Sequence, residues 1–329
     1  MANKRHYNGQ SALFIIVAVV LLVGMDYIFF TKKKAKPPEP PQIIEVQQQN
    51  TQPPVAAPPV VLGGQTLPEF ASARNLSTGQ IMPPPELPQW QKNAVSSNVL
   101  KDKPRIVLII DDMGLDVKHS RQAMDLPGPL TMSFMPYAKN LRAQTSYAIS
   151  QGHELMVHVP MQPENSKLDA GPKVLKVEQS PEQFLQILDN DLKSFGGYVG
   201  INNHMGSKMT QDRNGMARLM AELKTRGLLF VDSKTIGTSV AADEAKKAGV
   251  PFAARDVFVD DEETNKAIEG SLGHIEKLAL SKGLAVAIAH PRAETVDALK
   301  AWLPTLKAKG IELVPVSAVV TVPVPGQHK

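Results

Sequence analysis

Between residues 104 and 320, short apolar runs alternate with segments of helical pattern, and this alternation restricts the possible folds more than any other feature. The first run, residues 105–110, is aliphatic at every position after its arginine, as in a strand buried on both faces. Seven further runs lie at residues 130–134, 154–158, 198–202, 228–232, 251–255, 284–290 and 311–316. Strand, helix and strand repeated in this order require parallel pairing with right-handed crossovers. The sequence therefore predicts an α/β domain, a distorted (β/α) barrel of seven or eight parallel strands, with a doubly wound open sheet as the alternative.

The segments between the runs carry the signals of helix ends. Ser180, Pro181 and Gln183 form a capping box with proline at the first helical position. Gly249 and Gly283 each end a helical segment just before an apolar run. These signals predict helices between the strands.

Six of the predicted strands end in side chains that can bind a metal ion or transfer a proton. Asp111 and Asp112 directly follow the first run. The later strand ends supply His158, then Asn202, Asn203 and His204, then Asp232 and Ser233, then Arg255 and Asp256, and finally His290 and Arg292. Because the carboxyl ends of parallel strands meet at one mouth of a barrel, we expect these side chains to form a single site.

One carboxylate and two imidazoles are a common set of ligands for a catalytic metal ion. The chain contains no cysteine, so a divalent ion bound by nitrogen and oxygen is the natural candidate, and the residues do not choose among zinc, cobalt, nickel and manganese. We expect Asp112, His158 and His204 to be the ligands. Asp111 is then placed to accept a proton beside the ion.

Five motifs carry a resemblance to a known family. IIDDMG, HVPMQP, NNHMGS, FVDSKT and AHPR occur in this order, and together they resemble the divergent polysaccharide deacetylase family. The resemblance covers about residues 104–320 and implies a deacetylase-like α/β barrel of the bacterial envelope. It also implies a polysaccharide or other glycan as substrate and a divalent metal ion, with zinc as the expected one.

The resemblance also implies roles for individual residues. Asp111 would be the catalytic base, and His290 the acid that gives a proton to the leaving amine. Asp232 is expected to orient His290. The residues expected to bind substrate are Asn203, Arg255 and Arg292, either arginine also being able to steady Asp111.

Two departures from the family pattern leave the function open. Gln162 stands where standard deacetylases have a second histidine, four positions after His158, so His204 is the candidate for the second imidazole. No Arg-x-Pro-Tyr motif is present. One interpretation is a membrane-anchored, metal-dependent carbohydrate deacetylase, and the other is a non-catalytic barrel that binds glycan or organises envelope partners. Asp260 and its acidic neighbours are interpreted as a solvated turn.

The first hundred residues predict an anchor and a tether. Ser11–Phe30 has the length of one membrane-spanning helix, with a cleaved signal peptide as the alternative. Thirteen of the 27 prolines lie between Pro37 and Pro88, which predicts an extended, disordered linker. The expected organisation is a tail at residues 1–10, the anchor at 11–30, the linker at 31–103, the deacetylase-like domain at 104–322 and a tail at 323–329.

The distribution of charge bears on which partners the protein can bind, but it does not decide on which side of the membrane the domain lies. Residues 1–100 carry eight Lys or Arg against five Asp or Glu, three of the chain's four surplus positive charges. The folded part is therefore nearly neutral, and we expect no nucleic acid partner. Lysines after the span favour a cytoplasmic domain, whereas the tether and the resemblance favour the reverse. We expect a single-pass protein of the bacterial inner membrane with its C-terminal domain in the periplasm. The sequence does not indicate the oligomeric state.

Overall fold

The apolar runs form one parallel sheet in the computed structural model, which describes residues 86–97 and 102–323. Its strands are β1 (Arg105–Met113), β2 (Thr131–Phe134), β3 (Glu154–Met161), β4 (Tyr198–Met205), β5 (Leu229–Asp232), β6 (Phe252–Ala254), β7 (Val257–Phe258), β8 (Leu284–Ala289) and β9 (Glu312–Leu313). The strand order is β6-β5-β4-β3-β2-β1-β8-β7, and β9 pairs with β1 outside this path. The predicted parallel α/β architecture is confirmed.

The eight strands of the path curl into a half-barrel, so the predicted barrel is only partly realised. The order ends at β6 on one side and at β7 on the other. Thr321 forms an antiparallel bridge with Phe252, with hydrogen bonds of 3.0 and 2.9 Å in the two directions between their backbones. The C-terminal segment thus occupies the edge of β6 on which a further parallel strand would pair.

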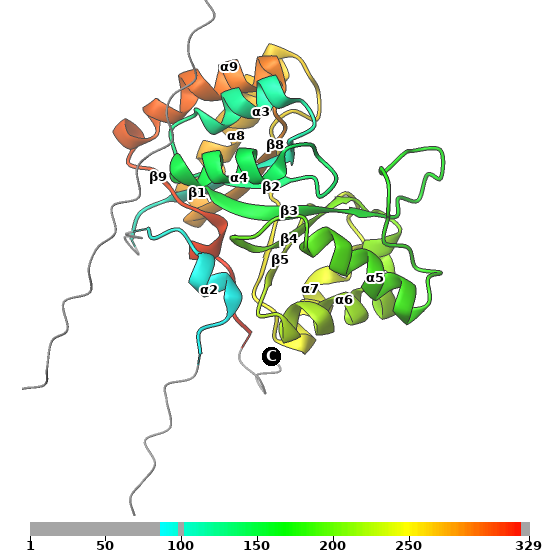
Figure 1. Ribbon diagram of the computed structural model, residues 1–329. Coiled ribbons are helices and arrows are strands. Elements are labelled where there is room, and N and C mark those ends of the chain that lie inside the picture. The colour runs from blue at the N-terminus through cyan, green and yellow to red at the C-terminus, as the bar shows by residue number, and fades with distance from the viewer. Residues whose placement is uncertain (1–85, 98–101, 324–329) are drawn as a thin grey trace, which may run out of the picture. The chain divides into compact units, whose positions relative to one another are not determined.

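Helices cover the outside of the sheet in two groups (Figure 1). The helices are α3 (Val117–Met124), α4 (Leu141–Ser150), α5 (Pro181–Leu192), α6 (Arg213–Thr225), α7 (Ala241–Ala248), α8 (Asn265–Lys282) and α9 (Ala293–Trp302). One hydrophobic cluster joins α3, α4, α8 and α9 to β1, β2 and β8, and a second joins α5, α6 and α7 to β3, β4 and β5. The predicted capping box begins α5, and Gly249 and Gly283 end α7 and α8 in the left-handed conformation.

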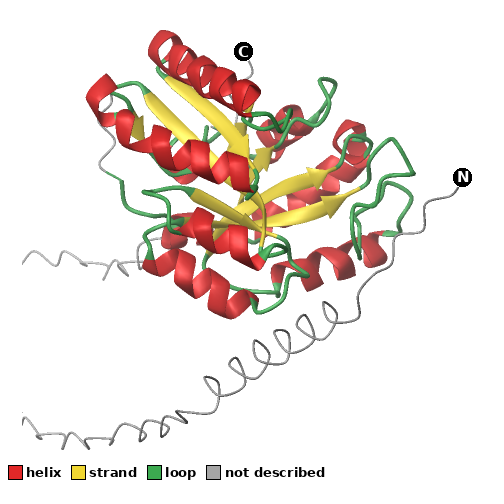
Figure 2. Cartoon of the chain, turned by 90° about the horizontal axis from the view of Figure 1, so that it is seen from above, coloured by secondary structure: helices red, strands yellow, loops and turns green. Residues whose placement is uncertain are grey.

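The inner face of the sheet has its own apolar core. Figure 2 shows the strands at the centre with helices outside them. Val107 and Ile109 of β1 point inward with Met156 of β3, while Ile106, Leu108 and Ile110 belong to the outer cluster. Side chains of a strand alternate between its faces, and continuing the inner row places Asp111 at the carboxyl end.

A short helix precedes the sheet inside the range predicted as linker. This helix, α2 (Gln89–Asn93), is bound by two hydrogen bonds. The Trp90 backbone N–H donates to the Gly227 carbonyl at 2.8 Å, and Asn93 Nδ2 donates to the Tyr198 carbonyl at 2.6 Å. Trp90 also packs on the inner cluster. A Trp and an Asn in a proline-rich segment therefore belong to the folded unit.

Within residues 86–97 and 102–323, no helix has the length and apolar character needed to cross a membrane. The predicted anchor Ser11–Phe30 lies outside the described residues.

Candidate metal centre

A bulge at the end of β1 turns both aspartates toward the same site. Adjacent strand residues normally point to opposite faces, so Asp112 should follow Ile110 to the outside. The pairing with β2 instead shifts between Ile110 and Met113, and Asp112 has a φ of 55°. Bulges re-aim side chains in this way, and aspartate is among the residues that tolerate the left-handed region. Both carboxylates consequently approach His158, Asp111 at 3.6 Å and Asp112 at 3.3 Å.

Asp112, His158 and His204 come together as predicted candidates for metal ligands. Asp112 Oδ1 lies 2.9 Å from His204 Nδ1 and 3.3 Å from His158 Nε2, and the two nitrogens are 3.2 Å apart. Ligands about 2.1 Å from a tetrahedral ion stand roughly 3.4 Å from one another. Asp112 Oδ1 is buried and, within the part of the chain that the structure describes, has no hydrogen-bond partner. This buried carboxylate oxygen and the two imidazole nitrogens lie close enough together to bind one metal ion.

Asn202 sets the tautomer of His158. His158 Nδ1 is 2.9 Å from Asn202 Oδ1, while Asn202 Nδ2 donates to both oxygens of Asp111, at 2.8 and 3.0 Å. Because the amide oxygen can only accept, Nδ1 of His158 must carry the proton. Its Nε2 lone pair then faces Asp112 and His204, as in metal sites whose ligating histidines donate through the other ring nitrogen.

The electrostatics of the paired aspartates differ. Burial raises the pKa of Asp111, which is 2% exposed, so Asp111 is the more basic carboxylate. Burial also acts on Asp112, but the imidazoles of His158 and His204 outweigh it and hold the pKa of Asp112 far below its usual range. For His158 burial lowers the pKa, yet the charges of Asp111 and Asp112 raise it to about 9, so a metal ion that binds through Nε2 would replace a proton there. Asp111 is thus suited to accept a proton, and Asp112 is suited to remain a carboxylate that can bind a metal ion.

His290 approaches the cluster from β8. Its Nε2 lies 4.0 Å from Asp112 Oδ2, and its Nδ1 lies 2.9 Å from Asp260 Oδ1. Burial lowers the pKa of His290, but the hydrogen bond and the charge of Asp260 outweigh it, and the pKa is raised. The raised pKa favours the protonated form of His290, whose Nε2 faces the ligand cluster.

Asp260, not Asp232, is the carboxylate that orients His290. The hydrogen bond to His290 Nδ1 comes from Asp260, whereas Asp232 Oδ1 accepts the Lys234 backbone N–H at 2.8 Å, which shapes the turn after β5. The interpretation of Asp260 as a solvated residue is wrong. Asp260 is 1% exposed, and its Oδ2 accepts from the His290 backbone N–H and from Thr295 Oγ1, both at 2.9 Å. The sequence could not single out Asp260, because no pattern shows which of the four adjacent acidic residues at 260–263 is buried.

The three residues predicted to bind substrate all have contacts within the protein. Asn203 Oδ1 accepts the Ser233 backbone N–H at 2.9 Å, and Asn203 Nδ2 donates to the Met205 carbonyl at 2.7 Å. Arg292 Nη1 donates to the Asp260 carbonyl at 2.8 Å and lies 3.3 Å from Glu263. Arg255 Nε and Nη2 donate to the carbonyls of Ser233 and Lys234, both at 2.7 Å. These contacts hold the side chains of Arg255 and Arg292 in place, and they tie Asn203 to the backbone of neighbouring segments.

Gln162 is not part of the ligand cluster. Its Nε2 donates to Glu178 at 3.1 Å, and its Oε1 accepts the Val177 backbone N–H at 3.1 Å. His204 of β4 supplies the second imidazole instead, next to Pro160 of β3 in the register. Asn202 could have been found from the sequence, because it lies two residues before His204 and so on the same face of the strand.

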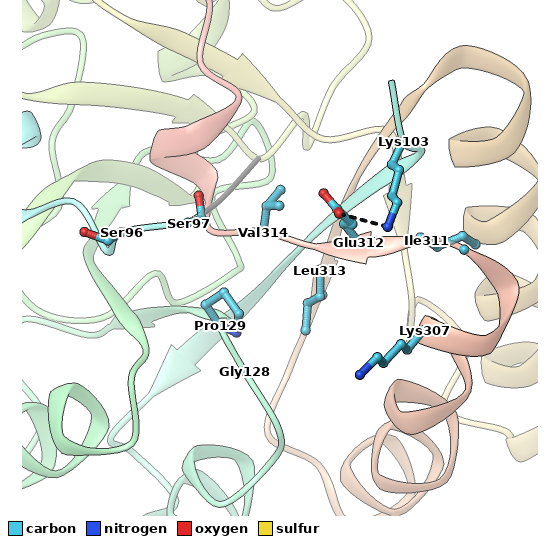
Figure 3. Close-up of a pocket in the computed structure, with 11 residues that line it drawn as sticks. Ser96, Ser97, Lys103, Gly128, Pro129, Lys307, Ile311, Glu312, Leu313 and Val314 are labelled. Atoms are coloured by element: carbon cyan, nitrogen blue, oxygen red, sulfur yellow. Dashed lines mark ion pairs between the residues drawn. The ribbon is translucent and has the colours of Figure 1, made fainter. Parts of the chain in front are cut away.

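A separate cavity of about 490 Å³ lies at the other end of the strands (Figure 3). An ion pair of 3.6 Å between Lys103 and Glu312 borders it. Glu312 pairs with Arg105 at the start of β1, whereas Asp112 is near its end, roughly 20 Å away along the strand. This cavity does not belong to the metal centre.

Comparisons with known proteins agree with this fold. The chain is 34% identical over 207 residues to the uncharacterized protein YibQ of Escherichia coli (strain K12), covering 63% of this chain and 64% of YibQ. It is 34% identical over 203 residues to an uncharacterized protein of Haemophilus influenzae, covering 61% of this chain and 72% of that protein. The crystal structure of the uncharacterized protein ATU2773 from Agrobacterium tumefaciens C58 matches with a TM-score of 0.68 and 25% identity, over 71% of this chain and 98% of that one.

A parallel half-barrel with an Asp–His–His cluster at the carboxyl ends of its strands defines an α/β domain with a candidate metal site. The sequence profile of the divergent polysaccharide deacetylases matches residues 108–320. The chain therefore belongs to the divergent polysaccharide deacetylase family.

Proposed function

We propose that the protein is a metal-dependent hydrolase that removes the acetyl group from an N-acetylated sugar of an envelope polysaccharide. The observation that carries the proposal is the convergence of Asp112, His158 and His204 between a buried carboxylate, Asp111, and the imidazole of His290. Family membership supports a glycan as the substrate. A base and an acid on two sides of a candidate metal site are the groups that amide hydrolysis needs.

The residues divide the proton transfers between them. A divalent ion, zinc in this proposal, would be held by Asp112, His158 and His204 and would supply a Lewis acid and an acidified water. Asp111, with its raised pKa, accepts the proton that the water loses as its oxygen bonds to the acetyl carbon. His290 Nε2 gives a proton to the amide nitrogen as the C–N bond breaks, releasing acetate and a free amine. Asp260 holds His290 in place during both proton transfers.

Metal analysis and an acetate-release assay on the purified full chain test this proposal. We expect about one divalent ion per chain and turnover of acetylated chitooligosaccharides or peptidoglycan fragments. Asp111→Asn should lower kcat by about 100-fold or more while the ion is retained, because the base is lost and the ligands are not. Asp243→Asn, at an exposed position of α7, is the matched control. A chain without bound metal and without turnover would instead fit the alternative, a non-catalytic glycan-binding protein.

The proposal includes an anchor. Ser11–Phe30 would hold the protein in the bacterial inner membrane by a single span, and the proline-rich segment would carry the domain into the periplasm. A reporter that is active only outside the cytoplasm, fused after Lys329, should give a signal. A cytoplasmic signal from a second, cytoplasm-specific reporter at the same position would reverse this localisation.

A further inference from the structure

Exposed apolar side chains gather on the three segments that follow β1, β2 and β3. Among the described residues, eight large hydrophobic side chains are exposed, and four of them lie on these segments: Leu115, Val117, Tyr137 and Leu168, each 37–53% exposed. Leu115 follows Asp112 of the metal centre by only three residues. Single exposed hydrophobic residues are ordinary, whereas a group of them on neighbouring segments is typical of an interaction surface.

The three segments contact one another, so these side chains belong to one surface. Gln144 donates through Nε2 to the carbonyl of Gly114 at 3.4 Å and to that of Lys139 at 2.8 Å, which joins the first segment to the second. The Tyr137 ring lies against Gly171 of the third segment, where a Cβ on the glycine would be only 2.7 Å from the Tyr137 Oη. We call these segments, residues 114–118, 136–142 and 163–176, the loop surface.

The loop surface carries a surplus of positive charge. Its exposed cations outnumber its exposed carboxylates by six to three: Lys118, Lys139, Arg142, Lys167, Lys173 and Lys176 against Asp116, Glu164 and Asp169. The exposed acidic residues 261–263 follow β7 instead, which lies beyond β1 and β8 in the strand order. Positive charge and apolar side chains therefore share one side of the metal centre.

An anionic lipid surface fits this combination of groups. Exposed aliphatic and aromatic side chains insert at the level of the head groups, and lysines around them are attracted to anionic lipids. A purely polar partner would leave the aliphatic side chains without contacts. The anchor proposed at Ser11–Phe30 would also keep a bilayer at high local concentration beside the domain, so that weak contacts suffice.

We infer that the loop surface rests on an anionic lipid bilayer, so that the metal centre lies at the membrane surface. The inference goes beyond the proposed function, because it uses the proposed anchor and not the proposed catalysis. It adds a second contact with the membrane, made by the folded domain. Glycans close to the bilayer are then the ones that reach the metal centre.

Fluorescent labels on the full chain test this inference. The chain has no cysteine, so Val117→Cys and Leu168→Cys each give a single site for a polarity-sensitive dye. Leu280→Cys is the matched control, because Leu280 is 56% exposed but lies in the last turn of α8, just before the amino end of β8. The vesicles contain phosphatidylglycerol and phosphatidylethanolamine, with nitroxide-labelled acyl chains as quenchers. We expect quenching about 3-fold stronger at both loop positions than at the control position.

Charge reversal tests the electrostatic part of the contact. Lys139→Glu together with Lys167→Glu should lower the quenching of the label at position 117 by about 3-fold. Lys277→Glu together with Lys300→Glu, at exposed positions of α8 and α9, is the matched control and should leave it unchanged. Replacing phosphatidylglycerol by phosphatidylcholine should act like the reversal on the loop surface. Thermal melting verifies that each variant is folded.

The outcomes separate this inference from the anchor and from catalysis. Equal, weak quenching of all three labels would overturn the inference, whether or not deacetylation is observed. A blue shift at the loop positions without quenching would mean that protein, such as a second copy of the chain, covers the surface, and would overturn it as well. Strong quenching at the loop positions of a chain that a sodium carbonate wash removes from the vesicles would retain the lipid contact and reject the anchor.

Discussion

In the proposed mechanism, Asp260 sets the pH range over which His290 acts as the acid. Since its charge and hydrogen bond raise the pKa of His290, His290 stays protonated to higher pH than an isolated histidine. The rate should fall as pH rises through this pKa. Asp260→Asn keeps the shape but removes the charge, so we expect the alkaline limb of the pH profile of kcat to move to lower pH, with kcat at neutral pH reduced by about 10- to 100-fold.

The control for this prediction is Asp297→Asn, an exposed position on α9. Its pH profile should coincide with that of the unmodified protein. A fall of kcat in Asp260→Asn that is equal at every pH would contradict the prediction, because loss of structure alone lowers the rate without moving the limb.

Single residues also show what the sequence could and could not predict about the site. Asp112, His158 and His204 could be predicted to meet because each lies at the end of an apolar run, and the carboxyl ends of parallel strands converge. Asp111 and Asp112 were also expected in this site, but strand geometry alone would point two adjacent residues to opposite faces, and the bulge with its φ of 55° at Asp112, which brings them together, has no signal in the sequence. Asp260 could not be distinguished from its acidic neighbours, since its burial depends on tertiary contacts with His290 and Thr295.

At the scale of elements, α5 contains a buried carboxylate that costs stability. Burial raises the pKa of Asp191 to about 7, and its Oδ2 has no hydrogen-bond partner among the described residues. Between about pH 4 and pH 7 the folded chain holds a proton that the unfolded chain releases, so stability declines as pH rises and the full cost is present above pH 7. We expect Asp191→Asn to raise the free energy of unfolding at pH 8 by roughly 2–4 kcal/mol.

Asp189, on the same helix, provides the matched comparison. Its carboxylate lies 2.5 Å from Arg226, which lowers its pKa. Asp189→Asn should therefore destabilise, by at most about 1 kcal/mol because the pair is partly exposed. Urea unfolding at pH 4 and at pH 8 measures both effects. The gain of Asp191→Asn should vanish near pH 4, and a gain that is independent of pH would show that the charge is not its cause.

The positions of the strands could be predicted more reliably than whether the sheet closes into a barrel. Each of the eight apolar runs contains a strand of the sheet, because short apolar runs that alternate with helical segments have few other structures open to them in an α/β chain. The two-residue strand β7 was not predicted, since Val257 and Phe258 form no run. The strand order ends at β6 and at β7, and Phe252 of β6 forms a bridge with Thr321, about seventy residues later. Periodicity within one segment carries no information about such a partner.

At the scale of the whole molecule, the folded unit extends beyond the family match into the proline-rich segment. The match begins at residue 108, yet α2 at Gln89–Asn93 lies against β4 and the turn before β5. Composition alone predicted a linker to residue 103, because a window rich in proline averages away two residues with specific contacts. Trp90 adds apolar surface to the inner cluster at the end of the sheet opposite the metal centre.

This packing predicts where the folded unit can be shortened. A chain that begins at residue 86 should unfold at a higher temperature than one that begins at residue 102, since the second lacks the burial of Trp90 and the hydrogen bonds of α2. Partial burial of one tryptophan contributes about 2 kcal/mol, which corresponds to about 4–8 °C in Tm for a domain of this size. In the longer chain, Trp90→Ala should produce most of this loss, whereas Lys92→Ala, on an exposed position of α2, should produce little. Equal Tm values for the two chains would mean that α2 contributes nothing to the fold, and the unit would then begin at β1.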